Sequence, residues 1–410
     1  MTPDSAGTHT FEAVADLTSR FVVTTYGRRP VAFVRGKGAR LWDTEGREYL
    51  DFVAGLAVCI LGHAHPKVTK AIRQQAGTLL HTSNLYHIPL QARLAERLAG
   101  LSGGMQSFFC NSGGEAMEAA LKLARKWAHV QRGLAEPEVI SALNSFHGRT
   151  YGALTLTGQE KYQKNFGPLL PGIRYARFND LDDFAAHFNE RTTAAVLEVL
   201  QGEGGVYEAN EEFLRGVEAL CRRFNALLIL DEVQTGMART GTFFAFQQYG
   251  LSPDIVTLAK GLAGGVPIGA MLAKPEVART FQPGDHASTF GGNFLACAAA
   301  LATLDVVEQK RLPQRAARLG RALARRINAF KRAGGPVASQ RGRGLLRAVQ
   351  LARPLAKQVE AECLARGLLV NAVQEDAVRL LPPLTISPAE LRRGLDILEE
   401  AIRAVFAKEG

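Results

Sequence analysis

The sequence contains no long hydrophobic run. Its longest unbroken apolar stretch is the short segment Phe294 to Ala302, whereas a helix that crosses a membrane needs about 20 apolar residues. Residues 1–16 carry acidic side chains and have no basic segment followed by an apolar one, unlike a secretion signal or a transit peptide. We therefore expect neither a membrane partner nor a targeting segment.

Cysteine is scarce and follows no metal-binding pattern. The chain has five cysteines, an odd number, and none is spaced as CxxC. This argues against a metal site and against a disulfide framework. The simplest interpretation is a set of buried free thiols in the reducing cytoplasm, which is the location we expect. The five are Cys59, Cys110, Cys221, Cys297 and Cys363.

The charge balance is basic, at +10, but the sequence has no nucleic-acid motif. Many arginines fall within residues 311–332, where apolar residues recur with helical spacing. Four of these arginines lie off the apolar stripe, so we interpret them as a solvated helix face and expect no nucleic-acid partner. The stripe is Ala316, Leu319, Leu323, Ile327 and Phe330; the arginines are Arg315, Arg318, Arg325 and Arg332.

The length of 410 residues favours two domains. Short apolar runs alternate with helical patterns through the middle of the chain, which indicates βαβ units and a mostly parallel sheet. The predicted strands cover residues 107–110, 138–143, 194–200, 226–230, 254–259 and 269–273, and the clearest helices cover 115–128 and 211–224.

The pattern changes after about residue 300. Long amphipathic helices and short strands at 344–351 and 377–383 predict a second, smaller α+β domain. Residues 30–52 alternate like strands and are expected to join it. The predicted bounds are 56–299 for the large domain, with 1–55 and 300–410 together forming the small domain.

An acidic residue ends the apolar run Leu227 to Leu230. Such a run predicts a strand buried on both faces, and a buried carboxylate is costly unless a positive group pairs with it. Asp231 lies at the carboxyl end of that strand, where parallel sheets bind their ligands. The sequence therefore predicts a cationic partner for Asp231, which need not be a protein residue.

A lysine, Lys260, follows the apolar run 254–259 and precedes a Gly-rich loop. Most lysines at strand ends are exposed and inert, but a lysine in an apolar pocket loses proton affinity and becomes a nucleophilic amine. Such amines form Schiff bases with carbonyl compounds, pyridoxal phosphate among them. The protonated ring nitrogen of that cofactor would be the cation that Asp231 needs.

A helix start further upstream is suited to the cofactor's phosphate. Ser112 is a plausible helix cap, and Gly113 and Gly114 leave backbone N–H groups free at the positive end of the helix. An ordinary helix start is the alternative, and the motif gains weight only beside the lysine and the aspartate.

Several motifs spread along the chain carry a family resemblance. They are YLDFVAGLAVCILGHAHPKV, HTSNLYH, FFCNSGGEA, NSFHGRTYGALTLTGQEKYQ, LEVLQGEGGV, LILDEVQTGMARTG, PDIVTLAKGLAGG, GDHASTFGGN and VRLLPPL. Together they resemble the class III pyridoxal-phosphate aminotransferases, most closely the acetylornithine aminotransferases. The resemblance implies an α/β protein of fold type I, with a large, mostly parallel sheet flanked by helices and a smaller α+β domain.

The resemblance assigns cofactor roles to matching residues. Lys260 would hold the cofactor covalently, and Asp231 would pair with its ring nitrogen. Phe146 would stack on the ring, Val233 would pack under it, and Gln234 would contact the ring hydroxyl.

The resemblance also implies a phosphate site and a homodimer. Ser112, Gly113 and Gly114 would bind the phosphate. Thr289 would reach the phosphate of the neighbouring subunit, and Ser288 would lie near the substrate. The partners implied are therefore a second copy of the chain and small amino acids.

Two arginines bear on the implied reaction, in which N2-acetyl-L-ornithine and 2-oxoglutarate give N-acetylglutamate 5-semialdehyde and glutamate in arginine biosynthesis. Arg149 would clamp the distal carboxylate of acetylornithine. Arg379 would clamp the α-carboxylate of glutamate, and Glu203 would pair with Arg379 when that carboxylate is absent, as in the similar ornithine enzymes. A surface ion pair is the commoner role of a single arginine.

The sequence departs from the family at two positions. Gly114 stands where the family has Ala or Thr, which would loosen the helix entry. Val199 stands where the family has Pro, so the preceding Glu198 is left out of the expected catalytic set.

Other interpretations stay open at this point. Ornithine, succinylornithine and a carrier-protein-bound aminoadipate semialdehyde of lysine biosynthesis are alternative substrates, and the net charge of +10 would suit an acidic carrier. A class III aminomutase would need no external 2-oxoglutarate. An inactive, cofactor-binding regulatory protein is the alternative from another class; the intact lysine, aspartate and arginines argue against it.

Overall fold

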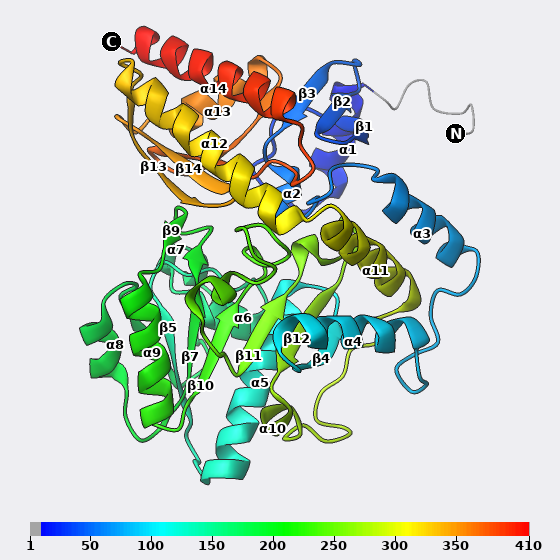
Figure 1. The fold of residues 1–410 in the computed structure, drawn as a ribbon, viewed down its shortest axis with the longest axis vertical. Helices are drawn as coiled ribbons and strands as arrows, with labels where there is room; N and C mark the ends of the chain where they lie inside the picture. The colour runs from blue at the N-terminus through cyan, green and yellow to red at the C-terminus, as the bar shows by residue number, and fades with distance from the viewer. Residues whose placement is uncertain (1–9, 410) are drawn as a thin grey trace.

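The computed structural model describes residues 10–409 of the chain. A large domain occupies the lower half of Figure 1, and a small domain above it combines the blue N-terminal strands with the yellow-to-red C-terminal part. The helix α1 (Phe11–Phe21) precedes both and contains no buried residue.

The large domain is built on a seven-stranded sheet of order β4-β12-β11-β10-β7-β5-β6. Strand β12 pairs antiparallel with both of its neighbours, and the other pairs are parallel. The predicted fold class, a mostly parallel α/β sheet, is therefore confirmed. The strands are β4 (Gln106–Cys110), β5 (Glu138–Ala142), β6 (Ile173–Ala176), β7 (Thr192–Glu198), β10 (Leu227–Asp231), β11 (Ile255–Leu258) and β12 (Gly269–Ala273).

Helices cover both faces of this sheet, because alternate residues of each central strand point to opposite sides. In β10, Leu227 and Ile229 join the hydrophobic cluster around α5, whereas Leu228 and Leu230 join the one that contains α9. The helices of this domain are α3 (Pro66–Ala76), α4 (Pro89–Ser102), α5 (Gly113–Arg132), α6 (Tyr151–Leu156), α7 (Glu160–Gln163), α8 (Leu181–His187), α9 (Glu211–Arg223), α10 (Pro275–Ala278) and α11 (Phe294–Gln309).

Three short elements complete the large domain. They are the hairpin β8 (Leu200–Gln201) with β9 (Tyr207–Glu208), and the 3-10 helices η1 (Ala245–Tyr249) and η2 (Lys260–Ala263).

The small domain holds two four-stranded sheets, of order β1-β2-β3-β15 and β13-β14-β17-β16. Strand β3 pairs in parallel with β15, so the N-terminal strands share a sheet with the C-terminal part of the chain. The elements are β1 (Phe33–Lys37), β2 (Arg40–Asp43), β3 (Glu48–Asp51), α2 (Ala54–Ala57), α12 (Leu312–Arg332), β13 (Val337–Arg343), β14 (Leu346–Leu351), α13 (Ala356–Ala365), β15 (Leu368–Leu369), β16 (Asn371–Gln374), β17 (Ala377–Leu380) and α14 (Pro388–Lys408). The exact domain bounds stay a prediction.

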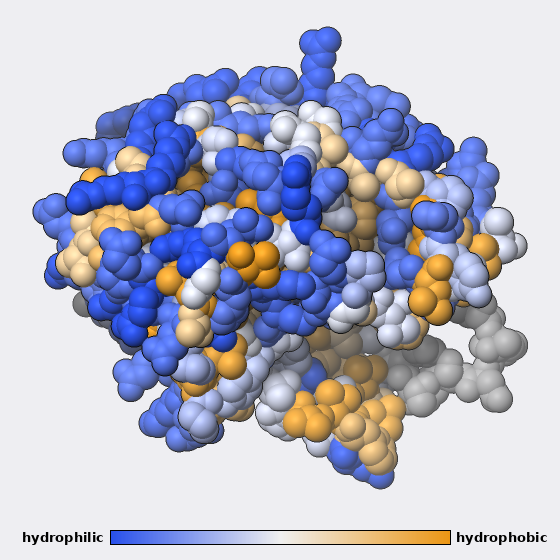
Figure 2. Space-filling view, turned by 90° about the horizontal axis from the view of Figure 1, so that it is seen from below, coloured by the Kyte–Doolittle hydropathy of each residue, from blue (hydrophilic) through white to orange (hydrophobic). Residues whose placement is uncertain are grey.

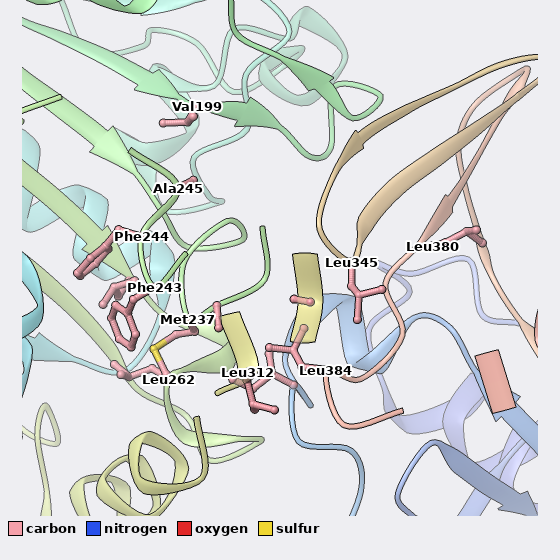
Figure 3. Close-up of a cluster of buried hydrophobic side chains, with 14 of the residues drawn as sticks. Val199, Met237, Phe243, Phe244, Ala245, Leu262, Leu312, Leu345, Leu380 and Leu384 are labelled. Carbon is pink, nitrogen blue, oxygen red and sulfur yellow. The ribbon is translucent and has the colours of Figure 1, made fainter. Parts of the chain in front are cut away.

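One hydrophobic cluster runs between the two domains. Met237 and Leu262 of the large domain meet Leu312, Leu345 and Leu384 of the small domain (Figure 3), and all five are buried. The two domains therefore share a core.

The hydrophilic surface and the buried apolar stripe of α12 agree with the sequence analysis, whereas Arg315 and Cys59 differ from it. The end of the molecule formed by the large domain is mostly hydrophilic (Figure 2). The predicted apolar stripe of α12 is buried. The prediction that Arg315 lies on a solvated helix face is wrong, because Arg315 is half-buried and its Nε donates to the Leu384 carbonyl at 3.0 Å. Cys59 is also only half-buried, and all five cysteines are free.

Residues 10–409 contain neither a membrane-spanning helix nor a candidate metal cluster. No described helix is long and apolar enough to cross a membrane. The same residues contain no group of three or more His, Cys, Asp or Glu side chains that could hold a metal ion.

Candidate active site

A cavity of about 440 Å³ lies at the carboxyl ends of β4, β7, β10 and β11. This is the edge of a parallel sheet where ligands bind. The cavity brings together ten of the thirteen residues singled out in the sequence: Ser112, Gly113, Gly114, Phe146, Arg149, Glu203, Asp231, Val233, Gln234 and Lys260.

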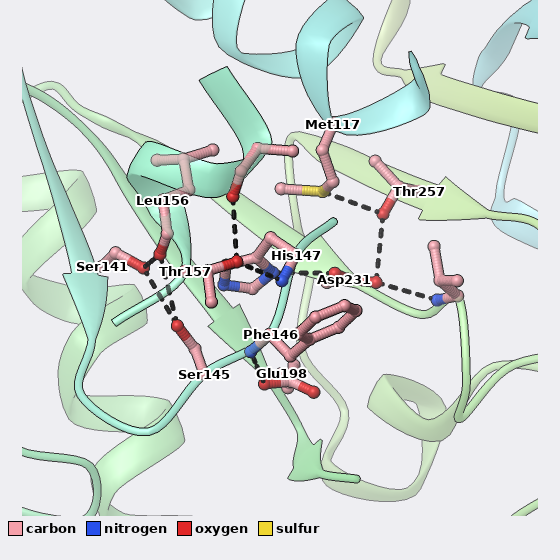
Figure 4. A network of polar contacts seen from close by, with 12 residues as sticks. Met117, Ser141, Ser145, Phe146, His147, Leu156, Thr157, Glu198, Asp231 and Thr257 are labelled. Carbon is pink, nitrogen blue, oxygen red and sulfur yellow. Dashed lines mark hydrogen bonds and ion pairs between the residues drawn. The ribbon is translucent and has the colours of Figure 1, made fainter. Parts of the chain in front are cut away.

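Asp231 ends β10 and is 5% exposed. Its Oδ2 lies 2.7 Å from His147 Nδ1, and its Oδ1 accepts from the Val233 N–H at 2.9 Å. Thr257 Oγ1 lies 3.4 Å from the same Oδ1. Figure 4 shows this network around the carboxylate. Asp231 therefore has a hydrogen-bonding partner within the protein, an imidazole that sequence reasoning missed, and its expected cationic partner stays a prediction.

His147 itself is held from behind. Its backbone N–H donates to Thr157 Oγ1 at 2.9 Å, and its side chain is fully buried. Its Nε2 has no hydrogen-bond partner among the described residues. The motif FHGRT could have predicted this contact, because His147 directly follows Phe146, the residue expected to stack on the cofactor ring beside Asp231.

Lys260 is the first residue of η2, directly after β11. Its φ of 41° is in the left-handed region, which is unfavourable for a residue with a side chain. Burial lowers the pKa of the Lys260 ammonium from its ordinary value. The Glu203 carboxylate acts in the opposite direction and raises this pKa, whereas the Arg379 guanidinium lowers it further. An amine with this tendency is available as a nucleophile and as a base at lower pH than a surface lysine.

The start of α5 supplies free backbone donors to the cavity. Ser112 is its N-cap, and Ser112 Oγ accepts from the Glu115 N–H at 3.1 Å. A Cβ added to Gly113 would lie 2.9 Å from Val233 Cγ1, so glycine permits the close approach of these two elements. A Cβ at Gly114 would meet nothing closer than 3.4 Å. The expected loosening at Gly114 is not seen, because the helix begins regularly at Gly113.

Glu203 and Arg379 form an ion pair beside the cavity. Arg379 Nη1 lies 2.6 Å from Glu203 Oε1, and the Arg379 side chain is fully buried. The same nitrogen donates to the Gly202 carbonyl at 2.9 Å and to Gln234 Oε1 at 3.2 Å, while Nη2 donates to Asn371 Oδ1 at 2.7 Å. Burial raises the pKa of Glu203, but the Arg379 guanidinium, the Lys260 ammonium and a hydrogen bond from Gln234 together hold it below its ordinary value. Arg379 lies behind Glu203 and does not line the cavity.

Glu198 lines the cavity although the sequence analysis left it out. It ends β7 and pairs in register with Asp231 of β10, so the two carboxyl groups leave the sheet side by side. Its oxygens accept from the Phe146 N–H at 3.1 Å and the Gly202 N–H at 3.4 Å. Burial, and then the charge of Asp231, raise the pKa of Glu198 well above its usual range. The expectation that ligands bind at the carboxyl ends of parallel strands would have predicted Glu198 as a cavity residue.

Ser288 and Thr289 lie outside the cavity of their own chain. Ser288 Oγ accepts from Asn111 Nδ2 at 3.2 Å and from the Gly291 N–H at 3.1 Å. Thr289 is exposed. Its expected contact with the phosphate of a neighbouring subunit stays a prediction.

Comparison with known proteins identifies this arrangement. The family model described as "Aminotransferase class-III" matches residues 23–402. The chain belongs to the class III aminotransferases. The family depends on pyridoxal phosphate, so the chain is a pyridoxal-phosphate-dependent aminotransferase.

Two curated relatives illustrate the similarity in sequence. The acetylornithine aminotransferase of Gloeobacter violaceus is 48% identical, over 94% of this chain and 96% of the relative. The acetylornithine aminotransferase of Aquifex aeolicus is 47% identical, over 93% of this chain and 100% of the relative.

Solved structures give the same fold. The ornithine aminotransferase of Toxoplasma gondii superposes with a TM-score of 0.93 at 35% identity, covering 97% of this chain and 96% of that one. The acetylornithine aminotransferase of Elizabethkingia anophelis superposes with a TM-score of 0.86 at 33% identity, covering 96% and 99%.

The donor set of the cavity fits pyridoxal phosphate. An aldehyde needs an amine, a pyridinium needs a carboxylate, and a phosphate needs N–H donors at a helix start. Lys260, Asp231 and the first residues of α5 supply these three groups around a single cavity.

Proposed function

We propose that this aminotransferase moves the side-chain amino group of N2-acetyl-L-ornithine to 2-oxoglutarate, giving N-acetylglutamate 5-semialdehyde and glutamate. The observation that carries the proposal is that one of the two arginines at the cavity is paired with a carboxylate and the other is not. Arg379 is engaged by Glu203, whereas Arg149 has no hydrogen bond or ion pair with any described residue. The curated relatives named above as acetylornithine aminotransferases support the same assignment.

The two substrates make different demands on the cavity. Acetylornithine reacts at a terminal carbon without a neighbouring carboxylate, and its carboxylate lies at the far end. Arg149, at the exposed side of the cavity, would bind that distal carboxylate through two parallel N–H bonds. Glutamate reacts at a carbon that does carry a carboxylate, which would displace Glu203 and bind Arg379. The ion pair thus screens Arg379 during the first half-reaction.

The cofactor roles expected from the sequence belong to the proposal. Lys260 would hold the cofactor, Asp231 would face its ring nitrogen, and Phe146 and Val233 would pack on opposite faces of its ring. Gln234 would contact the ring hydroxyl as well as the ion pair. The phosphate would bind Ser112, Gly113 and Gly114 at the start of α5.

Proton transfer falls to Lys260. When bound, the cofactor supplies an electron sink for the electrons of the broken C–H bond. The freed Nζ of Lys260 would take the proton from the amino-bearing carbon of the substrate and return it on the cofactor side. The lowered pKa of this amine favours the uncharged form that accepts a proton. Asp231, fixed by His147 and the Val233 N–H, would keep the ring nitrogen protonated.

A homodimer is part of the proposal. Thr289 is exposed on its own subunit, so it is free to reach the phosphate site of a second copy. Ser288, next to it, would approach the substrate from the same loop.

Ornithine is the second candidate for the amino donor, because the Toxoplasma gondii structure named above is an ornithine aminotransferase. Succinylornithine is a further amino donor with a terminal reacting carbon, whereas a carrier-bound aminoadipate semialdehyde would be an amino acceptor at such a carbon.

Titration of the holoenzyme separates these candidates. Without 2-oxoglutarate, each amino donor should convert the bound cofactor once, and its absorbance band should bleach. N-acetylornithine should bleach the band at concentrations well below those required for ornithine. Bleaching by ornithine at equal or lower concentration would assign ornithine instead.

A further inference from the structure

The arginine proposed to bind the distal carboxylate rests on an aromatic ring outside the cavity lining. The guanidinium carbon of Arg149 lies 4.2 Å from the ring centroid of Tyr162 and 5.6 Å from that of Phe146. The two rings meet edge to face, at 5.7 Å and 77°. Arg149 therefore packs against a corner made by two aromatic side chains.

The ring of Tyr162 has a fixed support. Tyr162 lies in α7, the single helical turn Glu160–Gln163. The amide of Gln163 donates to the Thr157 carbonyl at 2.7 Å and lies 2.9 Å from the Tyr175 hydroxyl. Thr157 also receives the backbone N–H of His147, two residues before Arg149. The turn that carries Tyr162 is thus tied to the segment that carries Arg149.

Stacking on a ring leaves the guanidinium ready for a carboxylate. A cation over an aromatic face uses its flat side, whereas the N–H donors that bind a carboxylate lie in the guanidinium plane. No described acidic side chain forms an ion pair with Arg149, in contrast to Arg379. An exposed arginine normally loses rotamer freedom when it binds a ligand. A ring that already orients the side chain reduces that loss.

We propose that Tyr162 is a specificity-determining residue, which orients Arg149 for the distal carboxylate of the amino donor without touching the reacting atoms. The inference rests on the proposed function and deepens it. Tyr162 should therefore affect donors that carry a distal carboxylate and should leave the same amine without a carboxylate unaffected.

The test compares N-acetylornithine with N-(4-aminobutyl)acetamide, which is the same terminal amine without the carboxylate. Single-turnover bleaching of the holoenzyme band gives an apparent Kd and a saturating rate for each donor. For Tyr162→Leu, the Kd for N-acetylornithine should rise about fivefold, corresponding to a cation–π contribution of about 1 kcal/mol. The saturating rate, and the Kd for N-(4-aminobutyl)acetamide, should stay within about twofold of the wild type.

Matched variants separate stacking from simple packing. Tyr162→Phe keeps the ring face and should behave like the wild type. In an Arg149→Gln background, Tyr162→Leu should have no further effect on N-acetylornithine, as a double-mutant cycle requires. If Tyr162→Leu does not fold as a holoenzyme, Tyr162→Met serves in the same comparisons.

Three results would overturn the inference: an equal effect on both donors, no effect on either, or a loss in Tyr162→Phe as large as in Tyr162→Leu. In each case the wild type would still react with N-acetylornithine, so the proposed function would stand. Failure of the wild type to react with N-acetylornithine would remove the proposed function and this inference together.

Discussion

His147 Nδ1 lies 2.7 Å from Asp231 Oδ2, and both side chains are buried. The contact joins the turn after β5 to the end of β10. A buried carboxylate with an imidazole on one oxygen and a backbone N–H on the other is held at a fixed position. The group that would face the cofactor's ring nitrogen is therefore the hydrogen-bonded pair of Asp231 and His147, and not Asp231 alone.

Replacement of His147 should weaken the hold on the cofactor's ring nitrogen. In His147→Leu, one oxygen of Asp231 loses its partner, so the carboxylate is held less firmly and keeps the ring nitrogen protonated less well. We expect kcat to fall by roughly 10- to 100-fold, about 1.4–2.8 kcal/mol, and the pH at which the cofactor absorbance titrates to fall. His147→Asn, which keeps a side-chain amide near the Nδ1 position, should restore much of both. An unchanged spectral titration in His147→Leu would contradict this role.

The ion pair of Glu203 and Arg379 should control the balance between the two substrates. Glu203→Gln keeps the shape but removes the charge that engages Arg379. The kcat/KM for glutamate should rise about tenfold relative to that for N-acetylornithine, as expected for one charge-assisted hydrogen bond. Glu136→Gln, at an exposed position outside the cavity, is the control. Equal changes in both half-reactions would rule out this selective role.

Glu232 should make the free energy of unfolding depend on pH. Burial raises the pKa of Glu232 from 4.5 to about 7. Hydrogen bonds from Thr235 Oγ1 and the Phe246 N–H lower this pKa but do not cancel the effect of burial. Because the folded-state pKa is the higher one, the folded protein holds an extra proton between these values, and stability is lost as the pH rises from about 4.5 to about 7. The loss should be about 3 kcal/mol, because a pKa difference of one unit corresponds to about 1.36 kcal/mol.

Urea unfolding of holoenzyme and of Glu232→Gln between pH 5 and pH 8 measures this effect. Other titrating groups are common to both proteins, so their difference isolates Glu232. The difference should grow with pH in favour of Glu232→Gln and become constant above about pH 7. A difference that is flat across the range would show that Glu232 titrates normally.

Two adjacent glycines should respond differently to alanine. In Gly113→Ala the new Cβ would lie 2.9 Å from Val233 Cγ1, so the start of α5 or Val233 must shift. We expect the Kd for pyridoxal phosphate to rise about tenfold. Gly114→Ala is the matched control: its Cβ has room, and alanine favours a helix by about 0.5–1 kcal/mol. Equal cofactor affinity in both variants, measured by equilibrium dialysis, would argue against a fitted phosphate site.

The sequence predicted the parts of the molecule that rest on local patterns. Six of the seven strands of the large sheet follow from their apolar runs, and α5 and α9 follow from helical periodicity, so these elements were placed within a few residues. Asp231 and Lys260 were predicted to share a cavity because parallel strands bring their carboxyl ends to one edge.

Other features depend on contacts between distant segments. Strand β6, with partly polar residues at the edge of the sheet, has no continuous apolar run. His147 was missed because it acquires its role only when β5, β7 and β10 lie side by side. Glu198 was named but left out because a valine replaces the family's proline directly after it. The contact of Asn371 with Arg379 likewise arises from the register of β16 on β17.

The most direct test is to locate the amine that binds the cofactor. Borohydride reduction of the holoenzyme fixes a reducible carbon–nitrogen link, and peptide mass spectrometry then identifies the modified lysine. The account predicts that pyridoxal phosphate is found on the peptide that contains Lys260, and that Lys260→Ala has neither the modification nor amino transfer. Modification of a different lysine, or full activity in Lys260→Ala, would contradict it.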